Sequence, residues 1–171
     1  MTQREKTQRI ALCGLLLSLM LILGYVESMI PVAPGIPGIK LGLSNGVLVF
    51  AVYLLGIPNA IILMVLKVLL SGILFSGVSA MMYGFAGGVL SLLGMILLSR
   101  IKSLSPIVVS AVGGLLHNVG QVALAMVILG TPKLIYYMAI LMLVGLATGA
   151  ATGAAAYGVM RTKGLRGKRG G

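Results

Sequence analysis

Apolar residues follow one another along this chain in runs whose length suits a lipid bilayer. A helix needs about 20 mainly apolar residues to span the hydrocarbon core, and glycines, prolines and charged clusters separate six runs of that order. The runs cover residues 10–29, 43–55, 59–75, 80–99, 107–129 and 134–160. This pattern predicts an all-α integral membrane protein, folded as a bundle of six transmembrane helices.

Two features of these runs bear on the architecture. The run 43–55 is short, so its helix is expected to tilt little, to thin the bilayer or to begin below the outer surface. The last run carries small residues at four-residue spacing, at Gly145, Gly149 and Gly153. Such faces let helices approach closely, and we expect them to serve packing within the bundle.

The segment Ile30 to Asn45 interrupts the helical pattern between the first two runs. It holds three prolines and three glycines, which cannot continue a helix. Irregular backbone is tolerated at membrane depth only where it is buried in protein or lines a cavity. The segment is therefore either a lid or re-entrant wall of a binding site, or an external hairpin.

Composition and charge agree with a membrane protein. Of 171 residues, 59% are hydrophobic and 9% are charged, whereas soluble domains carry roughly 25% charged residues. Ten of the thirteen Lys and Arg residues lie in three clusters bordering apolar runs. The clusters are Arg4, Lys6 and Arg9; Arg100 and Lys102; and Arg161, Lys163, Arg166, Lys168 and Arg169.

This charge distribution predicts the topology. Cytoplasmic loops and tails of membrane proteins carry an excess of Lys and Arg, and six crossings place all three clusters on one side. We predict one transmembrane domain over residues 1–160 with both termini cytoplasmic, followed by a basic cytoplasmic tail over 161–171. The tail has no aromatic residues on which bases could stack, so no nucleic-acid partner is expected. The first run is expected to be a retained helix, because no signal-peptide cleavage site follows it.

The chemistry-bearing residues are too few for a catalytic or metal centre. The chain has one cysteine, Cys13, one histidine, His117, and two acids, Glu5 and Glu27. It contains no G-x-x-x-x-G-K-[ST] phosphate loop. We predict no enzymatic activity, no metal site and no cofactor.

Polar residues inside the apolar runs suggest a binding site instead. At about 1.5 Å of rise per residue, Lys67 and His117 fall at a similar depth near the midplane, with Asn118 and Gln121 beside His117. Ionisable residues at this depth indicate function by default, and an anionic or carbonyl-bearing ligand would satisfy Lys67. Alternatively, Lys67 snorkels or bonds backbone carbonyls, and His117 forms an interhelical hydrogen bond.

Glu27 lies further out, near the outer interface. A direct bridge from Glu27 to Lys67 would be strained, so we expect Glu27 to pair with Lys40 and to anchor the Ile30–Asn45 segment over the bundle.

Three motifs resemble a known family. They are E-S-M-I-P at 27–31, P-G-I-K-L-G-L-S-N-G at 37–46 and L-L-G at 54–56. They resemble the Gx transporter family, often labelled heptaprenyl diphosphate synthase component I and related to the substrate-binding S components of energy-coupling factor (ECF) transporters. The resemblance covers nearly the whole chain.

The resemblance implies a six-helix S-component-like fold, with an outward-opening ligand pocket beneath the loop after the first helix. It also implies a docking face on the first helix for a transmembrane coupling subunit energised by separate ATPases. Gly14 and Ser18 match that face in place of the usual alanine pair, and their alternative role is internal packing. Prenyl diphosphate synthases hold magnesium on aspartate-rich motifs. This chain has no Asp, so we do not expect it to be a catalytic subunit.

The preferred hypothesis is a substrate-binding subunit of an uptake transporter in the bacterial cytoplasmic (inner) membrane, for an isoprenoid- or cofactor-related small molecule. The alternative is a non-catalytic membrane subunit that works with a prenyl synthase or flavoprotein, in heptaprenyl diphosphate and quinone biosynthesis or in flavin-based membrane electron transfer. The predicted substrate-binding residues are Lys40, Asn45, Lys67, His117, Asn118 and Gln121.

Overall fold

Six α-helices and one short π-helical turn make up the fold in the computed structural model, which describes residues 2–30 and 40–162. The α-helices are α1 (Gln3–Ser28), α2 (Asn45–Leu54), α3 (Ile57–Ser71), α4 (Gly77–Ser99), α5 (Pro106–Leu129) and α6 (Leu134–Thr162), and the π-helical turn η1 (Gly72–Ser76) joins α3 to α4. The described residues contain no β-strand. The predicted all-α fold is confirmed. The basic residues beyond Thr162 and most of the Ile30–Asn45 segment, residues 31–39, lie outside the described ranges.

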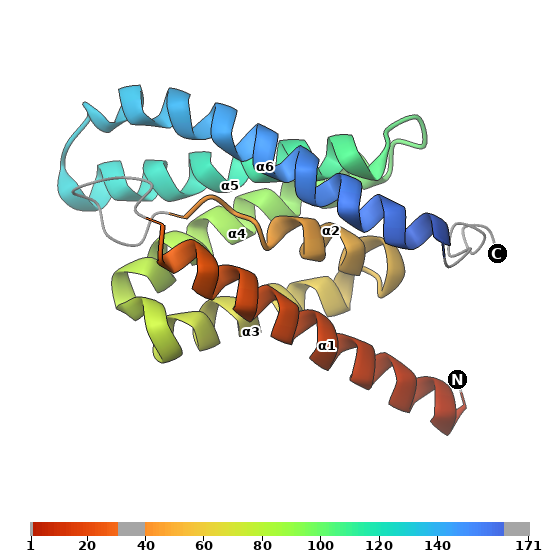
Figure 1. Cartoon of the computed structure of the whole chain (residues 1–171). Coiled ribbons are helices and arrows are strands. Elements are labelled where there is room, and N and C mark those ends of the chain that lie inside the picture. Colours follow the sequence, from red (N-terminus) through yellow and green to blue (C-terminus); the bar gives the residue numbers. More distant parts are fainter. Residues whose placement is uncertain (1, 31–39, 163–171) are drawn as a thin grey trace.

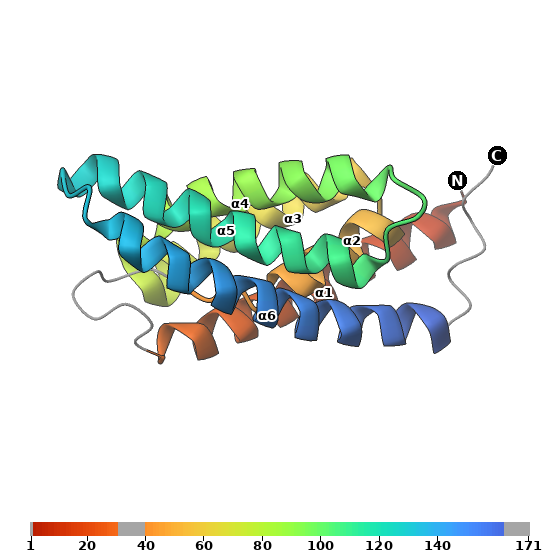
Figure 2. The same cartoon turned by 90° about the horizontal axis from the view of Figure 1, so that it is seen from above.

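Successive helices run in alternating directions along the bundle (Figure 1). The helix α1 begins at the end of the bundle where α6 ends, and the connection between α4 and α5 lies at this end too (Figures 1 and 2). The first cluster of basic residues, the Arg100 and Lys102 cluster, and Arg161 therefore share one end of the bundle.

The reversal between α3 and α4 takes place at η1. Read without a break, Ile57–Ser99 is a single helical stretch of 43 residues. Gly77, directly after η1, has a φ of 79°, a left-handed conformation that glycine adopts without steric cost. The chain turns back there, so that α3 and α4 lie antiparallel (Figure 1).

Local signals explain where α5 begins and ends. The Ser105 side chain accepts a hydrogen bond from the backbone N–H of Val108 at 3.3 Å, and Pro106 occupies the first helical turn. A side-chain cap and an early proline favour a helix start. Gly130 ends the helix with a φ of 58°, the left-handed cap that glycine favours.

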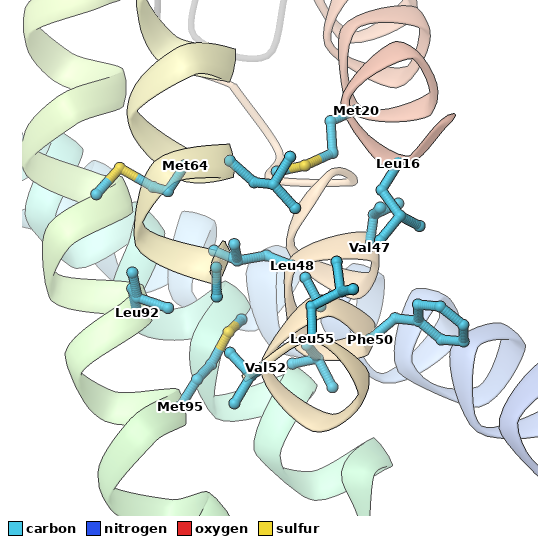
Figure 3. Close-up of a cluster of buried hydrophobic side chains, with 14 of the residues drawn as sticks. Leu16, Met20, Val47, Leu48, Phe50, Val52, Leu55, Met64, Leu92 and Met95 are labelled. Carbon is cyan, nitrogen blue, oxygen red and sulfur yellow. The ribbon is translucent and has the colours of Figure 1, made fainter. Parts of the chain in front are cut away.

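The short helix α2 forms the centre of the bundle. Eight of its ten residues are buried, and its apolar side chains on several sides contact α1, α3 and α4. Figure 3 shows Leu48 and Val52 among side chains from these helices. A helix that is apolar on every side is stable only when it is surrounded. This helix begins two residues later than predicted, and the preceding residues 40–44 lie inside the bundle as non-helical backbone.

Four helical stretches among the described residues are long and apolar enough to cross a membrane. They are Gln3–Ser28, Ile57–Ser99, Pro106–Leu129 and Leu134–Arg161. Large apolar side chains such as Leu15, Ile73 and Val127 point outward and are more than half exposed, an arrangement suited to lipid. The chain is a membrane protein, and its six crossings remain a prediction.

Small residues bring α5 and α6 into backbone contact. A Cβ atom added at Gly145 would lie 2.5 Å from the carbonyl oxygen of Gly114, and one added at Gly149 would lie 2.5 Å from that of Ser110. Any side chain there would force the helices apart. The predicted role of this glycine spacing in internal packing is confirmed.

Candidate functional site

Charged and amide side chains gather inside the bundle, where apolar packing would be expected. They come from α1, α2, α3, α5 and the residues just before α2, and each is at most 6% exposed. The members are Glu27, Lys40, Asn45, Lys67, His117, Asn118 and Gln121. We refer to Glu27, Lys40, Lys67 and His117 as the charged cluster, because electrostatic interactions connect these four.

Lys40 is bound to α5 through its backbone. Its N–H donates to Oε1 of Gln121 at 2.9 Å, and Nε2 of Gln121 donates to the Lys40 carbonyl at 3.3 Å. One side chain thus satisfies both polar groups of a buried, non-helical residue, which would otherwise be costly to bury. Gln121 thereby holds this part of the chain inside the bundle.

The Lys40 side chain reaches η1. Its Nζ donates to Oγ of Ser76 at 2.6 Å and lies 5.2 Å from the centre of the Phe75 ring, close enough for a cation–π interaction. Burial and then the charge of Lys67 lower the pKa of the Lys40 ammonium to about 8, although Glu27 opposes the shift. Ser76 lies outside the apolar runs on which the prediction of the site rested, and Phe75 is the last residue of the run 59–75.

The hydrogen bond that joins Glu27 to the residues before α2 goes to their backbone and not to the Lys40 side chain. Oε1 of Glu27 accepts a hydrogen bond from the backbone N–H of Leu43, and Oε2 has no hydrogen-bond partner among the described residues. The electrostatic interaction of Glu27 with Lys67 exceeds that with Lys40. The expected Glu27–Lys40 pair is present only as this weaker electrostatic interaction, because the Lys40 ammonium donates its hydrogen bond to Ser76. Glu27 contacts the Ile30–Asn45 segment, as expected, but at the Leu43 backbone.

Lys67 interacts with the rest of the charged cluster through electrostatics, with Glu27 as its favourable partner. It is 5% exposed, and no hydrogen bond joins its ammonium to any described residue. The lysine stem lies against α1, since a Cβ atom added at Gly24 would be in ordinary contact with Cε of Lys67, at 3.8 Å. The side chain therefore stays inside the bundle and does not snorkel.

Asn45 and His117 meet around Gly42. Gly42 has a φ of 83°, and a Cβ atom there would lie 2.6 Å from Nδ2 of Asn45 and 3.2 Å from Cδ2 of His117. Nδ2 of Asn45 makes no hydrogen bond within the described ranges. Nδ1 of His117 lies beside the Gly87 backbone without the geometry of a full hydrogen bond. The glycine allows both polar side chains to approach the backbone before α2.

Asn118 forms its hydrogen bond with α6 and not with the described residues before α2. Its Nδ2 donates to the carbonyl of Leu141 at 2.6 Å and so joins α5 to α6. Sequence reasoning missed Thr148, whose Oγ1 lies 2.9 Å from the Val144 carbonyl of its own helix and 3.3 Å from the Leu41 carbonyl. Threonines in an apolar helix commonly bond their own backbone, so only the fold distinguishes this one.

Gly14 and Ser18 lie on the outward face of α1. Both are exposed, and a Cβ atom added at Gly14 would meet nothing within 4 Å. The alternative that they serve internal packing is therefore wrong for the described part of the chain.

An apolar pocket lies apart from the charged cluster. This open pocket of about 320 Å³ lies between α3, α4 and α5, lined by Val68, Leu69, Met81, Met82, Phe85 and Leu124. Nowhere in residues 2–30 or 40–162 do three His, Cys, Asp or Glu side chains come together as metal ligands would.

Comparison with known protein families gives a match over most of the chain. The family model described as heptaprenyl diphosphate synthase component I matches residues 16–159, which include every residue of the charged cluster. No curated protein and no solved structure matches the chain.

Proposed function

The chain belongs to the heptaprenyl diphosphate synthase component I family, and we propose that it acts as a membrane-embedded, substrate-binding subunit of a small-molecule uptake transporter. The observation that carries the proposal is the buried charged cluster. A bundle that only had to be stable would place apolar side chains there, since buried charge rarely adds net stability. Ionisable groups inside membrane helices usually mark ligand or ion sites.

The position of the cluster supports an outward-facing site. Glu27 is near the end of α1, and Lys40 contacts Ser76 in the turn between α3 and α4. These elements lie at the end of the bundle opposite the start of α1 (Figure 1). With the basic clusters on the cytoplasmic side of a bacterial inner membrane, a ligand would enter from outside, beneath the segment that precedes α2.

The outward face of α1 is consistent with docking to a partner protein. Ala11, Gly14 and Ser18 are all exposed on it, and small residues permit close helix contact. We propose that this face docks on a transmembrane coupling subunit that is energised by ATPases. The ligand would be an isoprenoid- or cofactor-related molecule.

A second candidate follows from the family description. A non-catalytic membrane subunit could hold a prenyl diphosphate synthase or a flavoprotein at the membrane, in support of quinone synthesis or electron transfer. In this role too, the chain itself would not be the enzyme, because it has no Asp with which to bind magnesium diphosphate.

Affinity purification from native membranes in mild detergent distinguishes the two candidate functions. Co-purification of ATPases with a coupling protein supports the transporter subunit, whereas co-purification of a prenyl synthase or flavoprotein supports the second candidate. Native mass spectrometry of the same sample should detect a retained small molecule. Lys67→Met should lose that molecule and the exposed control Lys133→Met should keep it. Equal retention in both variants would contradict a ligand site at Lys67.

A further inference from the structure

The charged cluster holds more basic than acidic groups. Lys40 and Lys67 are 6% and 5% exposed, and His117 is 2% exposed, while Glu27 is the one buried acid beside them. A single carboxylate can balance one lysine. If both lysines are charged, the cluster keeps an excess positive charge in a region where such a charge costs several kcal/mol.

No other acid of this chain can supply the missing negative charge. The full sequence contains only two acidic residues. The second, Glu5, accepts a hydrogen bond from the Thr2 backbone in the cap of α1, at the far end of that helix. This count covers all 171 residues, so it includes the segment 31–39.

The hydrogen bonds identify which ammonium lacks a hydrogen-bond partner in the described part of the chain. The Lys40 ammonium has Ser76 and the Phe75 ring as partners, and Glu27 is held by Leu43. Lys67 has no hydrogen-bond partner among the described residues, although it interacts electrostatically with Glu27. Asn45, near His117, has an unused N–H donor as well.

We infer that the ligand of this site carries an anionic group, a phosphate or a carboxylate, that binds to the Lys67 ammonium between α1, α3 and the backbone before α2. This inference rests on the proposed ligand-binding function and specifies the ligand class. Lysine binds such groups as a compact point charge, and a charge-assisted hydrogen bond to it is about twice as strong as a neutral one. His117 and Asn45 lie on the side of the site formed by α5 and α2.

Anion binding to the purified protein tests the inference. The probes are inorganic phosphate, inorganic diphosphate and acetate, each titrated at constant ionic strength against chloride. The protein is held in nanodiscs of phosphatidylcholine, and the readouts are thermal unfolding and calorimetry. We expect one of the three probes to bind saturably and to raise the unfolding temperature more than chloride does.

Matched variants locate the binding. Lys67→Met should weaken binding of that probe by roughly 30-fold or more, since losing one partner of a buried charge contact costs about 2 kcal/mol or more. Lys133→Met, the same change at an exposed position, should bind as the wild type does. Lys67→Gln is the second variant, and it gives the same test if the methionine protein does not fold.

The opposite pattern would overturn the inference. That pattern is no response to any of the three anions beyond that of chloride, or equal binding by the Lys67 variants and by Lys133→Met. Nanodiscs with added phosphatidylglycerol identify the source of the anion: competition with the probe indicates a lipid headgroup, and its absence indicates a free solute. Both of these outcomes support an anion-binding site at Lys67.

The same samples separate this inference from the proposed function. If native mass spectrometry finds a retained molecule that is neutral or cationic, the proposed ligand-binding function would be supported. The inference that the ligand is anionic would be refuted. Anion binding at Lys67 without co-purified ATPases or coupling protein would support the site and count against the transporter.

Discussion

The side-chain amide of Gln121 pairs with both backbone groups of Lys40, accepting from its N–H at 2.9 Å and donating to its carbonyl at 3.3 Å. The two residues are 81 positions apart in sequence. This pairing lets non-helical backbone lie inside a bundle of apolar helices, because no polar group of Lys40 has to reach water.

Replacing Gln121 by Leu should remove this support. The Lys40 N–H and carbonyl would stay buried without partners, and leaving such a group unsatisfied costs about 1–3 kcal/mol. We expect a lower unfolding temperature in detergent. Gln8→Leu makes the same change on the exposed start of α1 and should be nearly neutral. Equal stability of the two variants would show that the pairing contributes nothing.

Glycines of α6 provide a matched test of helix packing. Gly145→Ala places a Cβ atom 2.5 Å from both Gly114 O and Asn118 Nδ2, and such overpacking costs about 1–3 kcal/mol. Gly158→Ala meets nothing within 4 Å and should stabilise the helix by up to about 1 kcal/mol. Unfolding in mixed detergent would measure both. A Gly145→Ala protein as stable as Gly158→Ala would contradict the close α5–α6 contact.

Helix positions could be predicted because the apolar runs and their breakers are local in sequence. Pro106 and Gly130 bracket α5 as expected, and the burial of Lys67 and His117 follows from their place within apolar runs. The short α2 was the hardest element to place, since its ten residues are stable only when the other helices surround them.

The contacts of the site could not be predicted in the same way. They depend on where the chain reverses at Gly77, which brings Ser76 to Lys40, and on the positive φ of Gly42, which brings Asn45 beside His117. The depth of Glu27 along its helix suggested a Glu27–Lys40 pair in place of a bridge to Lys67. Backbone hydrogen bonding decided otherwise, because a buried N–H such as that of Leu43 also needs an acceptor.

Lys40 should make stability depend on pH. Its pKa in the folded protein is about 8, below the ordinary value of 10.5. Between these values the unfolded chain still binds the proton that the folded protein has released, so the free energy of unfolding should rise with pH. Lys40→Met lacks this group. We expect the stability of the wild type relative to Lys40→Met to be greater at pH 10 than at pH 7, and a difference that does not vary with pH would contradict the shifted pKa.

Glu27 should matter far more than the other acid of the chain. Glu27→Gln keeps an oxygen for the Leu43 N–H but leaves the buried lysines without a carboxylate, at a cost of roughly 3 kcal/mol. Glu5→Gln changes an exposed cap and should cost about 1 kcal/mol or less. Thermal unfolding compares the two directly. Similar losses would mean that Glu27 acts through its hydrogen bond and not through its charge.

Cysteine labelling can test how the bundle sits in the membrane. Thr2 and Ser103 are exposed at the end where α1 begins, and Thr131 is exposed in the connection between α5 and α6, at the opposite end (Figure 1). Single cysteines at these positions, in a Cys13→Ser background that removes the chain's one native thiol, can be exposed to a membrane-impermeant maleimide. Because basic clusters stay cytoplasmic, Thr131→Cys should react in cells with a permeable outer envelope, and Thr2→Cys and Ser103→Cys only after the inner membrane is opened. Reaction of Thr2→Cys and Thr131→Cys from the same side would contradict a bundle that spans the bilayer along its long axis.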